Sequence, residues 1–156
     1  MKINIGKFSK TSRKRNVKIE THDFDFWSLD HTFSLIITPV LIEFRDRYNN
    51  FSSGTPSGLS REEWLVILDE MIWSFDQIAN EEKDEPDPTD FGFLCSSEEK
   101  FQKCFLTPKG KVTHYFSGCF PTEEDQKRWV VAMKEYEKRI QHGLSLFGRY
   151  LRNLWE

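Results

Sequence analysis

The chain has 156 residues, of which 38% are hydrophobic and 30% charged, a balance typical of one globular domain. With 22 basic and 25 acidic residues, the net charge of −3 gives no argument for a nucleic-acid partner. No apolar run approaches the ~20 residues of a membrane span, and the basic N-terminus lacks the apolar stretch of a secretory signal. We therefore expect a protein that neither crosses a membrane nor is exported, with its 3 cysteines reduced.

The first 28 residues are predicted to form an extended arm. Apolar Ile3 and Ile5 alternate with polar residues, as do Val17 and Ile19, which is the period of half-buried strands. The polar residues between these segments would make a hairpin with a basic tip. Residues 1–20 carry seven basic residues against one acidic residue, a net charge of +6. Four of the basic side chains could contact phosphates, although a solvated tip is the favoured interpretation: Lys10, Arg13, Lys14 and Arg15.

Residues 29–80 are predicted to form two helices. In the first, apolar residues recur at steps of three and four and so share one face. Pro39 lacks the amide that an interior helical position donates, so this helix should kink there or restart. The second helix should begin after Ser60, because Ser60 and Glu63 have the spacing of a capping box, and it should end near Asn80.

The second half of the chain is predicted to contain an acidic loop, a second hairpin and a long last helix. Acidic residues and prolines dominate the loop at 81–100, and a Pro-Lys-Gly turn supports the hairpin at 101–118. The helix at 122–156 would bury one stripe of apolar side chains. Gly143 and Gly148 interrupt this helix, and each costs up to about 1 kcal/mol against alanine. Their presence indicates a bend or a close helix contact.

These elements predict a single domain over residues 1–156, of the α+β class and mainly α. Three long helices would surround an aromatic core, with one or two β-hairpins at the side. The 14 Phe and 5 Trp supply large flat rings for such a core. We expect five of these rings to share one dry interior: Trp27, Trp64, Trp73, Trp129 and Phe147.

No catalytic signature is present in the sequence. A G-x-S-x-G elbow, a Walker A loop and a G-x-G-x-x-G fingerprint are all missing, so we expect no catalytic residue and no cofactor. Two polar pairs interrupt apolar helical stretches and would form a metal or acid–base site if the helices brought them together: Asp30 with His31, and Asp69 with Glu70. Solvent exposure and helix capping are the favoured explanations of these residues.

The cysteines raise the question of a zinc site. Cys95, Cys104, His114 and Cys119 offer the right ligand types, but no two of them have the tight C-x-x-C spacing that starts zinc chelation. Reduced thiols in or near the core are therefore favoured, and no metal is expected.

The last helix ends in side chains that are typical of a binding surface. Arg149 and Arg152 lie beside Tyr150 in the sequence, and arginine with an aromatic ring commonly anchors a protein partner or a nucleotide base. Trp73 of the second helix is a further candidate contact. The simpler alternative is a terminal helix that packs into its own domain.

Tryptophan, aspartate and glycine recur with fixed local spacing in three segments of the chain. They are Phe26-Trp27-Ser28-Leu29-Asp30-His31-Thr32 with Leu35-Ile36-Ile37-Thr38-Pro39, Trp64 with Leu68-Asp69-Glu70-Met71-Ile72-Trp73-Ser74-Phe75, and Arg139-Ile140-Gln141 with Gly143-Leu144-Ser145-Leu146-Phe147-Gly148-Arg149-Tyr150 and Leu154-Trp155. Together these segments resemble a small protein family widespread in tailed bacteriophage genomes. The resemblance covers somewhat under half of the chain and leaves out residues 91–120. It brings no catalytic residue with it and implies a viral accessory protein in the cytoplasm of a bacterial host.

The function that we expect is binding without chemistry. A non-enzymatic phage accessory protein would bind a host protein, with the counteracting of a host defence as one such role, and homo-oligomerisation stays open. The alternatives are sequestration of a nucleotide-type small ligand, a component of the virion or its packaging machinery, and a metal-dependent enzyme built on Asp30, His31, Asp69 and Glu70.

Overall fold

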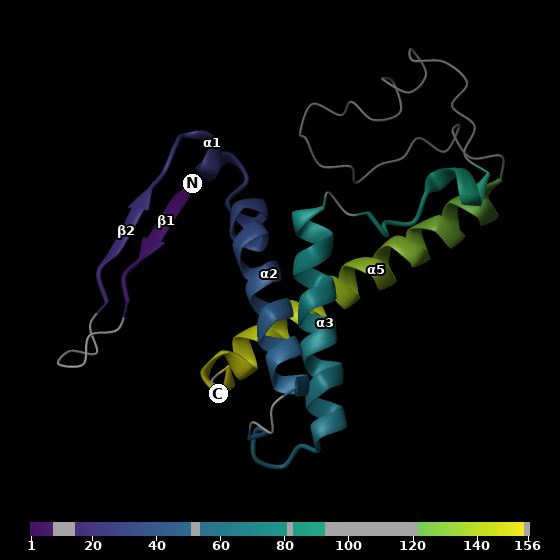
Figure 1. The fold of residues 1–156 in the computed structure, drawn as a ribbon. Helices are drawn as coiled ribbons and strands as arrows, with labels where there is room; N and C mark the ends of the chain where they lie inside the picture. Colours follow the sequence, from purple (N-terminus) through teal and green to yellow (C-terminus); the bar gives the residue numbers. More distant parts are fainter. Residues whose placement is uncertain (8–14, 51–53, 81–82, 93–121, 155–156) are drawn as a thin grey trace. The chain divides into compact units, whose positions relative to one another are not determined.

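The computed structural model describes residues 1–7, 15–50, 54–80, 83–92 and 122–154 (Figure 1). The predicted fold class is confirmed, because helices dominate these residues and one antiparallel hairpin accompanies them. The chain divides into two compact units, Met1–Glu82 with Gly143–Glu156 and Lys83–His142. That the whole chain acts as a single domain stays a prediction.

Strands β1 (Lys2–Ile5) and β2 (Val17–Glu20) form the predicted N-terminal hairpin. They pair antiparallel, with Ile3 opposite Ile19. Every residue of both strands is exposed, so the prediction of half-buried strands is wrong. Alternating apolar residues indicate a strand with one apolar face, but a sheet of two strands buries little surface of its own. The hairpin tip, with Lys10, Arg13 and Lys14, lies outside the described residues.

Two helices follow the hairpin, the one-turn α1 (Phe24–Trp27) and the long α2 (Leu29–Asn50). Helix α2 passes through Pro39 without a break, so a restart at this position does not occur. A proline removes one backbone hydrogen bond from a helix, yet α2 continues through Pro39 and packs against α3. The buried residues of α2 recur at helical spacing, and three of the four carry a hydroxyl group: Ser34, Thr38, Leu41 and Tyr48.

Helix α3 (Arg61–Ala79) begins and ends where the sequence predicts. The amide of Glu63 donates to the Ser60 hydroxyl at 3.1 Å, and the amide of Ser60 donates to the Glu63 carboxylate at 2.7 Å. This is a complete capping box, which satisfies two amides that the first turn of a helix leaves without partners. Asn80 ends the helix as its C-cap.

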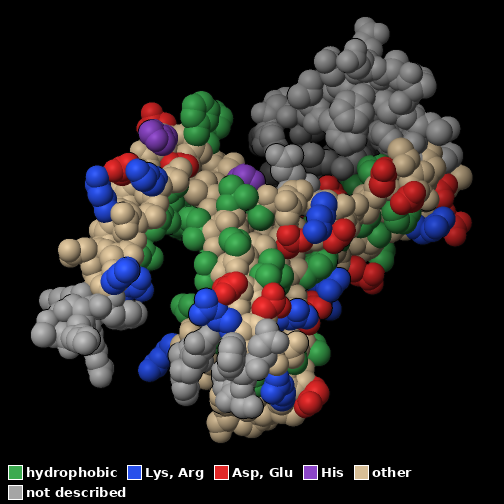
Figure 2. Space-filling view, in the orientation of Figure 1, with side chains coloured by type: hydrophobic (Ala, Val, Ile, Leu, Met, Phe, Trp, Pro, Cys, Tyr) green, Lys and Arg blue, Asp and Glu red, His purple; other side chains and the backbone are tan. Residues whose placement is uncertain are grey.

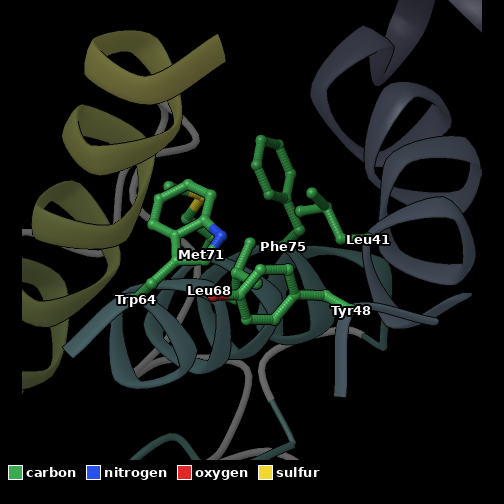
Figure 3. Packing of buried hydrophobic residues seen from close by; sticks show 6 residues of the cluster. All are labelled: Leu41, Tyr48, Trp64, Leu68, Met71 and Phe75. Carbon is green, nitrogen blue, oxygen red and sulfur yellow. The ribbon is translucent and has the colours of Figure 1, made fainter. Parts of the chain in front are cut away.

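The core of the first unit lies where α2 meets α3 (Figure 3). It mixes aromatic with aliphatic and sulfur-containing side chains: Leu41, Tyr48, Trp64, Leu68, Met71 and Phe75. The end of α5 adds two rings edge-on. Tyr150 meets Trp64 with ring centroids 5.4 Å apart, and Phe147 meets Phe75 at 4.9 Å. Edge-to-face contacts of this kind stabilise a core beyond the burial of the rings alone.

The five rings that were expected to share one interior have different surroundings. Trp64 and Trp129 are buried, and Trp73 and Phe147 are half-buried. Trp27 is 88% exposed, so its assignment to the core is wrong. The physical reason is local: Trp27 belongs to the one-turn helix α1, which has no buried residue.

The described part of the second unit consists of a 3₁₀ turn and the first part of helix α5 (Glu123–Tyr150). Within the predicted acidic loop, Asp87 caps the turn η1 (Pro88–Phe91). Trp129 of α5 is buried, and its indole N–H donates to the carbonyl of Pro86 at 3.4 Å. The predicted hairpin at 101–118 and the candidate ligands Cys95, Cys104, His114 and Cys119 lie outside the described residues.

Helix α5 begins after Thr122, whose hydroxyl accepts a hydrogen bond from the Asp125 amide at 3.1 Å. It ends earlier than predicted, at Tyr150, and a short 3₁₀ turn, η2 (Leu151–Asn153), follows. Of the two glycines that interrupt it, Gly143 lies in a close helix contact. Gly148 has open space around it, so close contact does not explain that residue.

Candidate protein-binding surface

Exposed apolar side chains are concentrated near the N-terminus. Of the fourteen large hydrophobic residues exposed in the described part of the chain, eleven lie within the first 42 residues. In Figure 2, apolar side chains reach the surface at α1 and along α2. Single exposed hydrophobic residues are normal on proteins, whereas a concentration of them marks an interaction site.

The hairpin contributes one complete apolar face. Because side chains alternate along a strand and paired residues share a face, the register places Ile3, Ile5, Val17 and Ile19 together. Their exposed fractions lie between 38% and 57%. The opposite face is polar and carries Lys2, Asn4, Lys18 and Glu20.

Helix α1 contributes three exposed aromatic rings. Phe24 is 86% exposed, and Phe26 and Trp27 are exposed as well. The polar residue among them, Asp25, anchors the turn. Its carboxylate accepts hydrogen bonds from the Met1 ammonium and from the His22 amide, both at 2.7 Å. The carboxylate of Asp25 thus ties the turn to Met1 and His22, while the three rings are exposed.

The hydrogen bonds of Asp25 also change its acidity. The Met1 ammonium, followed by the His22 amide, holds the pKa of Asp25 below its ordinary value of 3.8. The hydroxyl of Thr32 donates to the Asp25 carbonyl at 3.3 Å and joins α1 to α2. These contacts fix the position of α1, so its rings are presented on an ordered turn.

A pocket of about 250 Å³ lies between the start of the chain, Asp25 of α1 and the first turns of α2. It has an apolar wall and a polar end, and its lining residues are Met1, Ile3, Asp25, Thr32, Leu35 and Ile36. A pocket of this composition suits an apolar side chain of a partner, with the polar groups fixing its orientation. We call the exposed residues of the hairpin face and α1 the N-terminal apolar surface: Ile3, Ile5, Val17, Ile19, Phe24, Phe26 and Trp27.

The predicted metal or acid–base site is not assembled. Asp69 pairs with Arg45 of α2, with 3.0 Å between the Asp69 carboxylate and Nε of Arg45. Asp30 lies fifteen residues before Arg45 in the same helix, which is about 22 Å along its axis. His31 and Glu70 are half-buried. Among the described residues, no three His, Cys, Asp or Glu side chains gather as metal ligands would.

The candidate anchors at the end of α5 take part in packing. The ring of Tyr150 lies against Trp64, and the guanidinium of Arg149 lies over the same Tyr150 ring at 5.2 Å. Tyr150 is half-buried between these two contacts. Arg152 is exposed, and Trp73 is half-buried on α3.

The described end of the basic arm is Arg15. Its side chain is exposed, and its Nε donates to the carbonyl of Gly6 at 2.6 Å. Arg15 therefore closes the base of the hairpin loop. The other three candidate phosphate contacts, Lys10, Arg13 and Lys14, lie outside the described residues.

The sequence analysis did not identify the N-terminal apolar surface. Two signals in the sequence could have found it. One is the dense aromatic cluster around Asp25, in a segment too short to form a long helix. The other is a pair of alternating strands with no further strand beside them among the described residues.

None of the described helices is both long and apolar enough to cross a membrane. Comparison of the chain with protein-family models, with curated proteins and with solved structures finds no match in any of the three. The resemblance to a phage family therefore stays an expectation from the three sequence segments.

Proposed function

We propose that this protein is a non-enzymatic binding protein that docks a partner protein on its N-terminal apolar surface. The observation that supports this most directly is the exposure of the α1 rings, above all Phe24 and Trp27. Aromatic residues supply most of the binding energy in many protein interfaces. Exposed on a turn that Asp25 holds in place, they can bind without a large ordering cost.

The partner that we propose is a host protein in the cytoplasm of a phage-infected bacterium. This part rests on the three segments that resemble a family of tailed phages, and the counteracting of a host defence is a role that such binding would serve. Binding without catalysis is consistent with the sequence, which has no nucleophile elbow or phosphate-binding loop.

The test is co-purification from lysate of phage-sensitive bacteria, followed by reconstitution with the purified partner. The double variant Phe24→Ser with Trp27→Ser should lose the partner while remaining folded, because both side chains are exposed. The matched control is Val131→Ser, which removes an exposed apolar side chain from α5. If the double variant retains the partner as well as the control does, the proposed surface is wrong.

A further inference from the structure

Among the described residues, no strand other than β2 pairs with β1, and the other edge of β1 has a defined set of outward-pointing backbone groups. In the hairpin, Ile3 lies opposite Ile19, and the amide of Gly6 donates to the carbonyl of Asn16 at 2.8 Å. Antiparallel pairs alternate between hydrogen-bonded and non-hydrogen-bonded. Gly6 and Asn16 form a hydrogen-bonded pair, so the next pair along β1, Ile5 with Val17, is non-hydrogen-bonded. The pair of Ile3 with Ile19, two residues further back, is non-hydrogen-bonded as well. The amide and carbonyl groups of Ile3 and Ile5 therefore point away from β2, toward the outer edge of the sheet.

The hairpin has the properties of an incomplete sheet. A sheet of two strands is only marginally stable, and a third strand or a covering layer stabilises it. The apolar face is exposed, and the outward groups of β1 can accept an extended chain. The addition of a strand would pair these groups and widen the apolar face at the same time.

The pocket lies beside this same edge. Ile3 of β1 lines it together with Leu35 and Ile36 of α2. A chain that pairs with β1 at Ile3 would place a side chain next to this apolar wall. Main-chain pairing would then supply affinity, and the pocket would supply selectivity for an apolar residue.

The charge of the arm favours an acidic chain. Residues 1–20 have a net charge of +6, while the rest of the chain is acidic. Lys2, the first residue of β1, and Lys7, two residues beyond its end, are exposed. Directly paired residues of neighbouring strands share a face, so the added strand needs apolar residues opposite Ile3 and Ile5. Acidic residues between them would lie on the face of Lys2.

We propose that β1 binds an extended segment of a partner protein as a third, antiparallel strand, in which apolar and acidic residues alternate. The inference deepens the proposed function, on which it rests, by naming the chemistry of the partner segment and the way it binds. An acidic segment complements the basic arm, whereas the arm of a second copy carries the same charge of +6 and would be repelled, which favours a partner segment over a second copy as the occupant.

The test is fluorescence anisotropy of labelled peptides titrated with the full chain. The probe is a heptapeptide with blocked ends in which valine and glutamate alternate. It should bind saturably, and replacement of glutamate by lysine should weaken binding by about tenfold or more. Lys2→Glu should weaken binding of the glutamate peptide, while Lys138→Glu, an exposed lysine of α5, serves as the matched control with unchanged affinity.

Backbone methylation tests the pairing itself. In the proposed register the valine amides face β1 and the glutamate amides face solvent. N-methylation of the valine amides should therefore weaken binding by about tenfold, because two hydrogen bonds are lost. The same methylation on the glutamate amides should leave the affinity unchanged. Equal affinities of the two methylated peptides would overturn strand addition.

Three other outcomes also overturn the inference. They are no saturable binding of the valine–glutamate peptide, tighter binding of a single-stranded oligonucleotide, and self-association in sedimentation that the peptide does not reverse. None of them affects the loss of the partner by the Phe24→Ser, Trp27→Ser variant. The proposed function and the strand addition can therefore fail separately.

Discussion

Gly143 of α5 lies directly against Ser74 of α3. A Cβ atom placed on Gly143 would stand 2.7 Å from Cβ of Ser74 and 2.5 Å from the carbonyl oxygen of Glu70. Real side chains do not approach this closely, and one of the two obstacles is backbone. The crossing of the two helices therefore depends on the missing side chain of Gly143.

Substitution Gly143→Ala should destabilise the protein by about 1 kcal/mol net, since overpacking costs about 1–3 kcal/mol and the gain in helix propensity returns up to about 1 kcal/mol. Urea unfolding followed by circular dichroism measures the change. The same helix offers the control. Gly148 has nothing within 4 Å of its position, so Gly148→Ala should stabilise the protein by up to about 1 kcal/mol. Equal effects of the two substitutions would contradict the close crossing.

The tryptophans give a second prediction, because their burial differs so strongly. Trp64 is 1% exposed and meets Tyr150, so Trp64→Ala should cost about 3–5 kcal/mol of unfolding free energy. Trp27→Ala should change it by no more than about 0.5 kcal/mol, because the ring is in solvent. Chemical denaturation of the two variants checks both values. A large loss from Trp27→Ala would mean that α1 packs into the core.

Local features of the fold could be predicted from the sequence, and the ways in which distant parts meet could not. The capping box of Ser60 and Glu63 was predicted correctly because it needs only a spacing of three residues. The low helix propensity of glycine indicated either a bend or a close helix contact in this helix. The structure shows the close contact at Gly143. Both inferences depend on a short stretch of chain.

The candidate site needed information that periodicity does not contain. A stripe of apolar residues tells which face of α2 meets α3, but not which ends of the two helices meet. In the structure Arg45, late in α2, reaches Asp69, so Asp30 at the start of α2 is far from it. The attachment of α1 likewise depends on the contact of Asp25 with Met1, which are 24 residues apart in the sequence.

The separation of Asp30 from Asp69 gives a third prediction. The pair of Asp69 with Arg45 is exposed, so Asp69→Asn should cost at most about 1 kcal/mol. The double variant with Asp30→Asn should be additive within about 0.5 kcal/mol, because the two residues share no partner. Thermal unfolding with and without added Mg²⁺, Mn²⁺ or Zn²⁺ provides the second readout. Strong coupling, or a metal-dependent shift lost in both variants, would restore the metal-site hypothesis.

The last prediction concerns the loss of stability at low pH, to which Glu63 contributes. The Ser60 amide, followed by the Ser60 hydroxyl, holds the pKa of Glu63 below its ordinary value of 4.5. A carboxyl group whose pKa is lower in the folded than in the unfolded protein stabilises the folded state at pH values above its ordinary pKa. This contribution disappears as the pH falls through 4.5 and then through the lower folded pKa.

Glu63→Gln keeps the hydrogen bond of the capping box and removes the charge. The variant should be less stable than the unmodified protein near neutral pH, and the difference should close as the pH drops below 4.5. Urea unfolding across this range measures the difference. Glu62→Gln, in the same first turn but outside the capping box, is the control and should show a smaller difference throughout. If the difference in unfolding free energy between Glu63→Gln and the unmodified protein stays constant with pH, the charge of the Glu63 carboxylate does not contribute to stability through the capping box.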